Sequence, residues 1–137
     1  MNLTRDTPRS PKEKLANLVH IPRMRDKARA AQQNTLGEYI YPCPLDNIML
    51  EFIGVDSSTF QQNACVGTEA DLSAWVNTQC ENHSGEEMDT VNHRVIGSQP
   101  NDPEAWKYFN ETRDRVDPTR TDVITWVDLI DLEEGRL

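Results

Sequence analysis

The sequence predicts an all-α fold of seven or eight short helices around one core. Apolar residues recur at helical spacing along most of the chain, and a capping residue or a glycine terminator appears every dozen or so residues. The period-two alternation typical of half-buried strands is absent over any useful length. With 137 residues and 36% hydrophobic content, we expect a single domain over residues 1–137, with fraying at residues 1–7.

The first two helices are predicted from local signals. Ser-Pro-Lys-Glu at residues 10–13 offers a capping hydroxyl, a proline where no amide hydrogen is needed, and a glutamate three positions later. Three apolar residues at helical spacing follow, so we expect a helix from residue 10 to about residue 19. Pro22 then begins a second helix, which we expect to extend to about residue 33.

The following segment, residues 36–44, has the only β-like composition in the chain. It reads Tyr-Ile-Tyr at its centre, but Pro42 and Pro44 cannot occupy the interior of a paired strand. We therefore expect an extended, packed segment. Caps and terminators predict the remaining helices at residues 45–53, 56–66, 68–82, 86–96 and 102–117, and a last helix that begins at Thr121 or Asp122 and ends near Gly135.

Charge is distributed unevenly along this acidic chain, whose formal net charge is −9. Residues 1–40 contain eight Lys/Arg and four Asp/Glu, whereas residues 41–137 contain six and nineteen. The acidic part would repel a polyanion, so we expect no nucleic-acid partner. The basic part predicts either helices that lie on the acidic body or a separate surface for a partner.

The cysteines and the short apolar runs predict the cellular compartment of the protein. Cys43, Cys65 and Cys80 cannot all pair within one chain, and no secretory signal precedes them, so we expect free thiols in the cytoplasm. The apolar runs are too short to span a bilayer, so we expect no membrane partner. Cys80, His83 and His93 form only part of a zinc pattern, and we expect no metal and no cofactor.

The richest concentration of functional side chains lies between His20 and Asp46. The candidate binding residues there are Arg23, Asp26, Lys27, Arg29, Glu38, Tyr39, Cys43 and Asp46. Helical spacing places Arg23 and Lys27 on one face and Arg29 about 160° away. Arg23 and Lys27 would bind a carboxylate or phosphate. The alternative is a helix surface joined to the acidic body by ion pairs.

Three hypotheses for function follow from this stretch. The first is a non-enzymatic binding or interaction protein that takes an anionic small molecule or partner group at residues 22–46. The second is a small enzyme with Cys43 as nucleophile or Glu38 as general base, and Arg23 as electrostatic stabiliser. A buried, inert cysteine is the ordinary alternative for Cys43. The third is a structural subunit of a homo-oligomer, which would use exposed Trp or Tyr residues instead of this stretch.

Five blocks of sequence resemble a known family. They read R-S-P-K-E-K-L at residues 9–15, I-P-R-M-R-D-K-A-R-A at 21–30, L-G-E-Y at 36–39, C-P-L-D at 43–46 and W-V-D-L-I-D-L-E-E-G-R at 126–136. In order and spacing they are similar to a bacterial family of domains of unknown function, the one numbered five thousand and sixty-nine. The resemblance implies a small bacterial, cytosolic, single-domain protein, and it transfers no catalytic residue.

Overall fold

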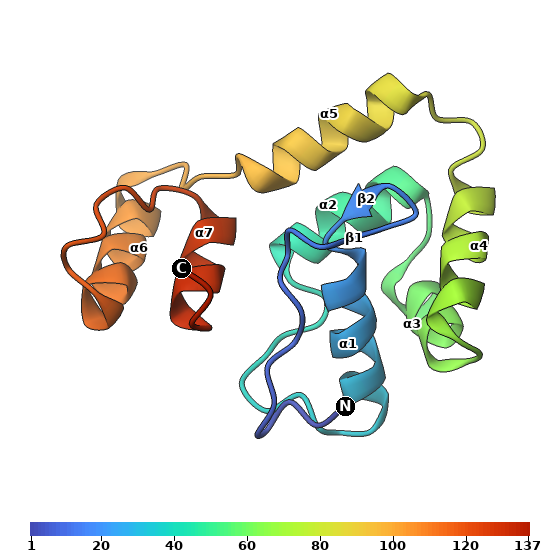
Figure 1. The fold of residues 1–137 in the computed structure, drawn as a ribbon, viewed down its shortest axis with the longest axis horizontal. Helices are drawn as coiled ribbons and strands as arrows, with labels where there is room; N and C mark the ends of the chain where they lie inside the picture. The colour runs from blue at the N-terminus through green and yellow to red at the C-terminus, as the bar shows by residue number, and fades with distance from the viewer.

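The structure, a computed structural model, describes residues 1–137 and contains seven α-helices and one two-stranded hairpin (Figure 1). The elements in chain order are β1 (Lys14–Leu15), β2 (Leu18–Val19), α1 (Ile21–Gln32), α2 (Pro44–Ile53), α3 (Ser57–Cys65), α4 (Glu69–Gln79), α5 (Gly85–Ile96), α6 (Pro103–Val116) and α7 (Trp126–Glu133). Each strand has only two residues. The prediction of an all-α fold is therefore confirmed.

The prediction of a helix at residues 10–19 is wrong, because this segment forms a turn and then the β1–β2 hairpin. The backbone N–H of Ser10 donates to the Glu13 carboxylate at 3.3 Å, as in a helix capping box, yet no helix follows. Ala16 and Asn17 adopt φ angles of 53° and 62°. Two consecutive left-handed residues reverse the chain, as in the tight turns of β-hairpins, and are incompatible with a right-handed helix.

The last helix begins later than predicted. Thr121 and Asp122 lie in the turn before α7, where Asp122 pairs with Arg120 at 3.0 Å. The N-cap is Thr125, whose hydroxyl accepts a hydrogen bond from the backbone N–H of Asp128 at 3.2 Å. Three other predicted caps are confirmed, since the side chains of Asp56, Thr68 and Asp102 each accept a backbone hydrogen bond at the start of a helix.

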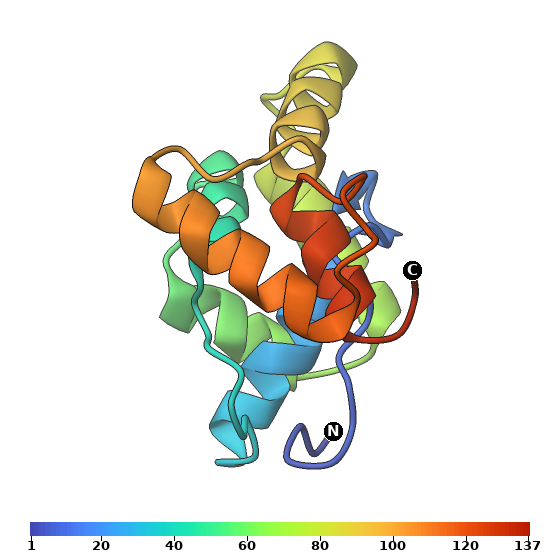
Figure 2. The same ribbon diagram turned by 90° about the vertical axis from the view of Figure 1, so that its left-hand side faces the viewer.

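Apolar side chains form two separate cores. The larger core contains 17 buried residues, mainly from the hairpin and α1–α5, and the smaller contains Phe109, Val123, Leu129 and Leu132. We call residues 103–137 the lobe and residues 1–96 the body. Figure 1 shows α6 and α7 together at one end of the molecule, and Figure 2 shows them side by side in front of the body. Val127 and the half-buried Trp126 connect the lobe to the larger core.

Polar contacts fasten the lobe to the N-terminal segment of the body. The Lys12 ammonium lies 2.6 Å from the Asp128 carboxylate, and the Ser10 hydroxyl donates to Asp131 at 3.0 Å. Arg136 donates to the backbone carbonyl of Pro8. The segment expected to fray also packs on the body, because Leu3 is buried and its N–H donates to the carbonyl of Thr35 at 2.8 Å. The position of α7 therefore depends on residues from the opposite end of the chain.

Asn92 of α5 holds the hairpin in place. Its side-chain oxygen accepts from the backbone N–H of Val19 at 2.9 Å, and its side-chain nitrogen donates to the carbonyl of Asn17 at 2.8 Å. Asn92 and Val19 are both buried. The hairpin therefore depends on one amide side chain from α5.

We expect Asn92→Ala to lower the free energy of unfolding by about 1–3 kcal/mol, because it leaves the buried N–H of Val19 without an acceptor. Urea denaturation monitored by circular dichroism measures this change. The control is His93→Ala, which alters the next, solvent-exposed residue and should change stability by less than about 0.5 kcal/mol. Equal effects of the two substitutions would contradict this account of the hairpin.

Candidate functional site

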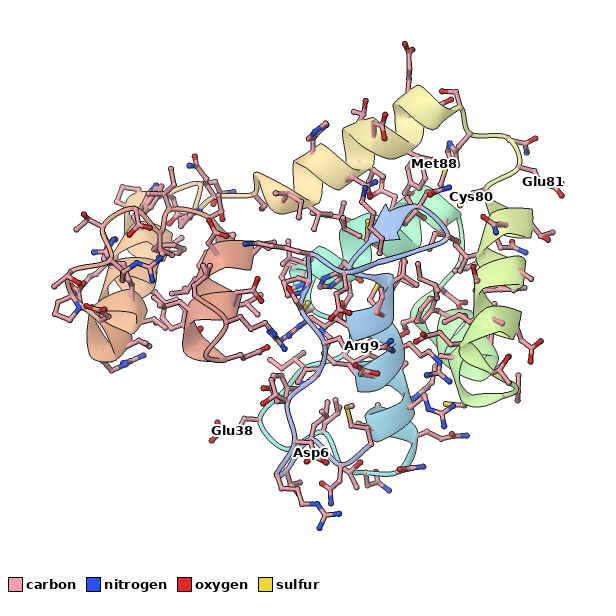
Figure 3. The ribbon with its side chains drawn as sticks, in the orientation of Figure 1. Asp6, Arg9, Glu38, Cys80, Glu81 and Met88 are labelled. Carbon is pink, nitrogen blue, oxygen red and sulfur yellow. The ribbon has the colours of Figure 1, made fainter.

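Two hollows lie where the lobe meets the body. The first, which we call the charged hollow, has a volume of about 630 Å³. It is lined from the body by Arg23, Glu38 and Tyr39 and from the lobe by Tyr108, Glu133 and Glu134. Figure 3 shows Glu38 projecting from the loop that connects α1 to α2. Three of the predicted site residues therefore line one hollow.

The second hollow, the apolar hollow, has a volume of about 480 Å³. Its walls include Cys43, Leu45 and Ile48 from the body, Gln99 and Asn101 from the connecting segment, and Trp126 from the lobe. No residue with a formal charge lines it. Ile130 of α7 is the one residue that lines both hollows. The two hollows therefore lie next to each other along α7 and differ in chemistry.

Arg23 forms a bidentate ion pair with Glu134 in the wall of the charged hollow. Its two terminal nitrogens donate to the two carboxylate oxygens of Glu134, each at 2.8 Å. The guanidinium also lies 5.5 Å from the ring centroid of Tyr39. Arg23 is only 4% exposed. This fork geometry is the one by which arginine recognises carboxylates.

Asp26 and Arg29 lie outside both hollows. Asp26 accepts hydrogen bonds from the guanidinium of Arg9 at 3.0 and 3.1 Å, so its partner is in the N-terminal segment and not on its own helix. Arg29 donates to the backbone carbonyl of Ala64 at the end of α3, at 3.0 Å. These two predicted residues thus take part in packing α1 against its neighbours.

Asp46 is the centre of a buried polar cluster behind Cys43. One carboxylate oxygen lies 2.6 Å from His20 Nε2, and the other accepts from Lys27 Nζ at 2.6 Å and from the backbone N–H of Cys43 at 2.9 Å. Burial opposes ionisation of Asp46, but the hydrogen bond from His20 and the charge of Lys27 lower its pKa to about 2. Asp46 is therefore ionised, and Lys27 is its buried counter-ion.

Cys43 does not have the depressed pKa that would make it a ready nucleophile. It precedes α2, and Lys27 Nζ lies 3.2 Å from its sulfur atom. Burial and the neighbouring Asp46 carboxylate nevertheless raise its pKa, and Lys27 only partly offsets this effect. A protonated thiol is a poor nucleophile at neutral pH. The half-buried Cys43 therefore acts here as part of the wall of the apolar hollow.

Possible metal ligands also meet in this cluster. Donor atoms of His20, Cys43 and Asp46 lie within 4.8 Å of one another. The Lys27 ammonium contacts both Cys43 and Asp46, so it already supplies the positive charge that these groups would offer to a metal ion. In the zinc-like pattern of the sequence, both ring nitrogens of His83 have oxygen partners, at 3.1 and 2.8 Å.

The sequence reasoning missed the residues that the lobe contributes. Glu134, Ile130 and Tyr108 are absent from the predicted site, although they line the charged hollow. A usable signal was present in the last helix, because Trp126, Ile130 and Glu133 recur at intervals of four and three residues and so share a helix face. Core packing gives Trp126 and Ile130 the same spacing, so this periodicity alone does not identify a site.

His20 was also missed, although three features distinguish it. It is fully buried, it has a left-handed φ of 75°, and its Nδ1 atom has no hydrogen-bond partner. Burial lowers its pKa, against the opposing effect of its hydrogen bond to Asp46. His20 is therefore neutral in the folded protein at neutral pH.

We expect acid to destabilise the fold through His20. Because its folded pKa is lowered, the unfolded chain binds a proton more readily, and stability falls as the pH decreases through the unfolded value near 6.5. Between pH 7 and pH 5 this group alone accounts for a slope of up to about 1.4 kcal/mol per pH unit. Asp46 does not titrate in that range, since its pKa is about 2.

Urea denaturation at several pH values measures this slope, which His20→Asn should reduce. The control is His83→Asn, because a hydrogen bond to Glu87 raises the pKa of His83. The folded state therefore gains stability from His83 in acid, and its removal should steepen the loss. A His20→Asn variant with the wild-type slope would refute the assignment.

Comparison with known proteins places the chain in a family. Residues 5–136 match the family described as Domain of unknown function (DUF5069), which confirms the resemblance noted from the five blocks. No curated protein matches the chain. In the structure, no helix has both the length and the apolar character needed to cross a membrane. The matched region contains all the residues of the Asp46 cluster and both faces of the two hollows apart from Leu3 and Thr4. The chain therefore belongs to the DUF5069 family.

Proposed function

We propose that this protein binds a small molecule between lobe and body and holds an anionic group of that molecule at Arg23. Hollows between two packed units are common places for ligand sites, and both volumes fall in the usual range for small molecules. The observation that carries the proposal is the bidentate pair between Arg23 and Glu134. Glu134 occupies the place where the carboxylate of a ligand would bind.

A ligand can replace Glu134 without leaving that residue unpaired. Arg136 also donates to Glu134, at 2.7 Å, so Glu134 keeps a cationic partner if Arg23 turns to a ligand. Arg23 is held in position on its other side by the carbonyl of Arg9, which accepts from it at 3.2 Å. The guanidinium is therefore oriented before any ligand arrives, which lowers the entropic cost of binding.

The charges around Arg23 favour a ligand with one negative charge over a polyanion. Glu38, Glu133 and Glu134 line the same hollow, and the whole chain carries a formal charge of −9. Partial burial and the neighbouring Glu134 raise the pKa of Glu133. A phosphate chain would be repelled by these carboxylates, whereas a monocarboxylate would only replace one of them. We therefore propose a monoanion as the ligand, in a bacterial cytoplasm that suits three free cysteines.

An enzyme is the alternative, and the geometry favours one version of it. Arg23 and Cys43 line different hollows, so they would not act on the same atoms. Glu38 and Arg23 line the same hollow, which suits an acid–base reaction on an anionic substrate. The third alternative, a homo-oligomer subunit, would use exposed Trp or Tyr residues, and Tyr108 of α6 is exposed whereas the three Trp residues are half-buried.

The test is a thermal-shift titration with acetate, hexanoate, inorganic phosphate and ATP. We expect hexanoate to stabilise the wild type, by about 2.7 kcal/mol at 100 times its Kd. Arg23→Lys should weaken binding at least about tenfold, because lysine cannot form the bidentate contact. Glu134→Gln should strengthen binding, because the internal competitor loses its charge.

The control is Glu104→Gln, an exposed glutamate of α6 outside both hollows. It should leave the affinity unchanged. Wild-type affinity in Arg23→Lys, or preference for ATP over hexanoate, would contradict the proposal. Because Glu134→Gln is expected to gain affinity, a folding defect in either variant cannot imitate the full pattern.

A further inference from the structure

One face of α7 runs from an apolar end to a charged end. Trp126, Ile130, Glu133 and Glu134 are spaced by four, three and one residues, so they share one side of the helix. Trp126 lines the apolar hollow, Glu133 and Glu134 line the charged hollow, and Ile130 lines both. At 1.5 Å per residue, the distance along the helix from Trp126 to Glu134 is about 12 Å. The two hollows thus lie along a single helix face.

The apolar hollow adjoins the charged hollow at one side chain. Ile130 is half-buried and is the only residue common to the two linings. Beyond it, Leu45 and Ile48 of α2 face the hollow together with Trp126, and the polar residues present are uncharged. A chain with 27% charged residues places none of them there. The apolar hollow is therefore suited to an apolar group of a ligand.

We propose that the ligand is an amphiphilic monocarboxylate whose carboxylate binds Arg23 and whose apolar chain lies along α7, past Ile130, in the apolar hollow. The inference rests on the proposed function for its charged end. The apolar end rests on different residues, those of α2, the connecting segment and Trp126. A ligand of this class matches the charged hollow and the apolar hollow, whereas a small hydrophilic anion would leave the apolar hollow empty.

The test is calorimetric titration of the wild type with butanoate, hexanoate and octanoate. If the alkyl chain of the ligand enters the apolar hollow, each added methylene should lower Kd about fourfold, which corresponds to about 0.8 kcal/mol. Octanoate should therefore bind more than a hundredfold more tightly than butanoate. 1-Octanol, which has the chain without the charge, should bind far more weakly than octanoate.

Two matched substitutions test where the apolar chain of the ligand binds. Asn101 is exposed at the rim of the apolar hollow, and Asn101→Trp would fill the hollow without altering the core. This variant should lose the gain with chain length and keep the wild-type affinity for butanoate. Asn82→Trp, at an exposed site between α4 and α5, should retain both properties.

The outcomes separate the inference from the proposed function. Equal affinities for butanoate and octanoate, or an unchanged gain in Asn101→Trp, would overturn the inference and leave anion binding at Arg23 intact. Binding of 1-octanol as tight as that of octanoate, with no effect of Arg23→Lys on either, would overturn the proposed function instead. Failure of every carboxylate to bind would overturn both.

Discussion

The ion pair between Arg23 and Glu134 is the constraint on which the arrangement of this protein depends. The two residues are 111 positions apart, and they join two parts whose apolar cores are separate. The lobe alone has a small core of four buried residues, so its position relative to the body relies on polar contacts together with the packing of Val127 and Trp126 against the larger core. Both hollows exist because α7 is held at this distance from α1 and α2. A contact that fixes the lobe therefore also shapes the candidate site.

The buried polar cluster of Asp46 lies next to the residues that line the two hollows. Lys27 lies one helical turn after Arg23 on α1, so one helix face supplies both the arginine of the charged hollow and the counter-ion of Asp46. Asp46 in turn accepts a hydrogen bond from the backbone N–H of Cys43, which precedes α2 and lines the apolar hollow. A buried ion pair is costly to form, and apolar residues would often serve stability as well. Its presence beside both hollows is consistent with a role in positioning.

Local signals in the sequence predicted most of the fold, and contacts between distant residues decided the rest. Asp56, Thr68 and Asp102 were predicted as caps because a cap needs only the next three residues. Ser10 and Glu13 formed the predicted local contact, but the left-handed turn at Asn17, held by Asn92 from α5, produced a hairpin. Residues 121–125 likewise had cap chemistry at more than one position, and the last of them, Thr125, is the N-cap.

The candidate site was predictable on one side only. The α1 face and the loop after it were predicted from their concentration of functional groups, and Arg23, Glu38 and Tyr39 do line one hollow. Their partner Glu134 could not be assigned, because no spacing rule relates residues on separate helices. The sequence also gave no reason to separate Cys43 from Arg23, which lie in different hollows.

The central claim is that Arg23 and Glu134 act as a coupled pair, and a double-mutant cycle tests it most directly. The free energies of unfolding of the wild type, Arg23→Met, Glu134→Gln and the double variant give the coupling energy between the two side chains. The account predicts a coupling energy of at least about 1.5 kcal/mol, because the pair is bidentate and nearly buried. A value below about 0.5 kcal/mol, as found for exposed ion pairs, would contradict it.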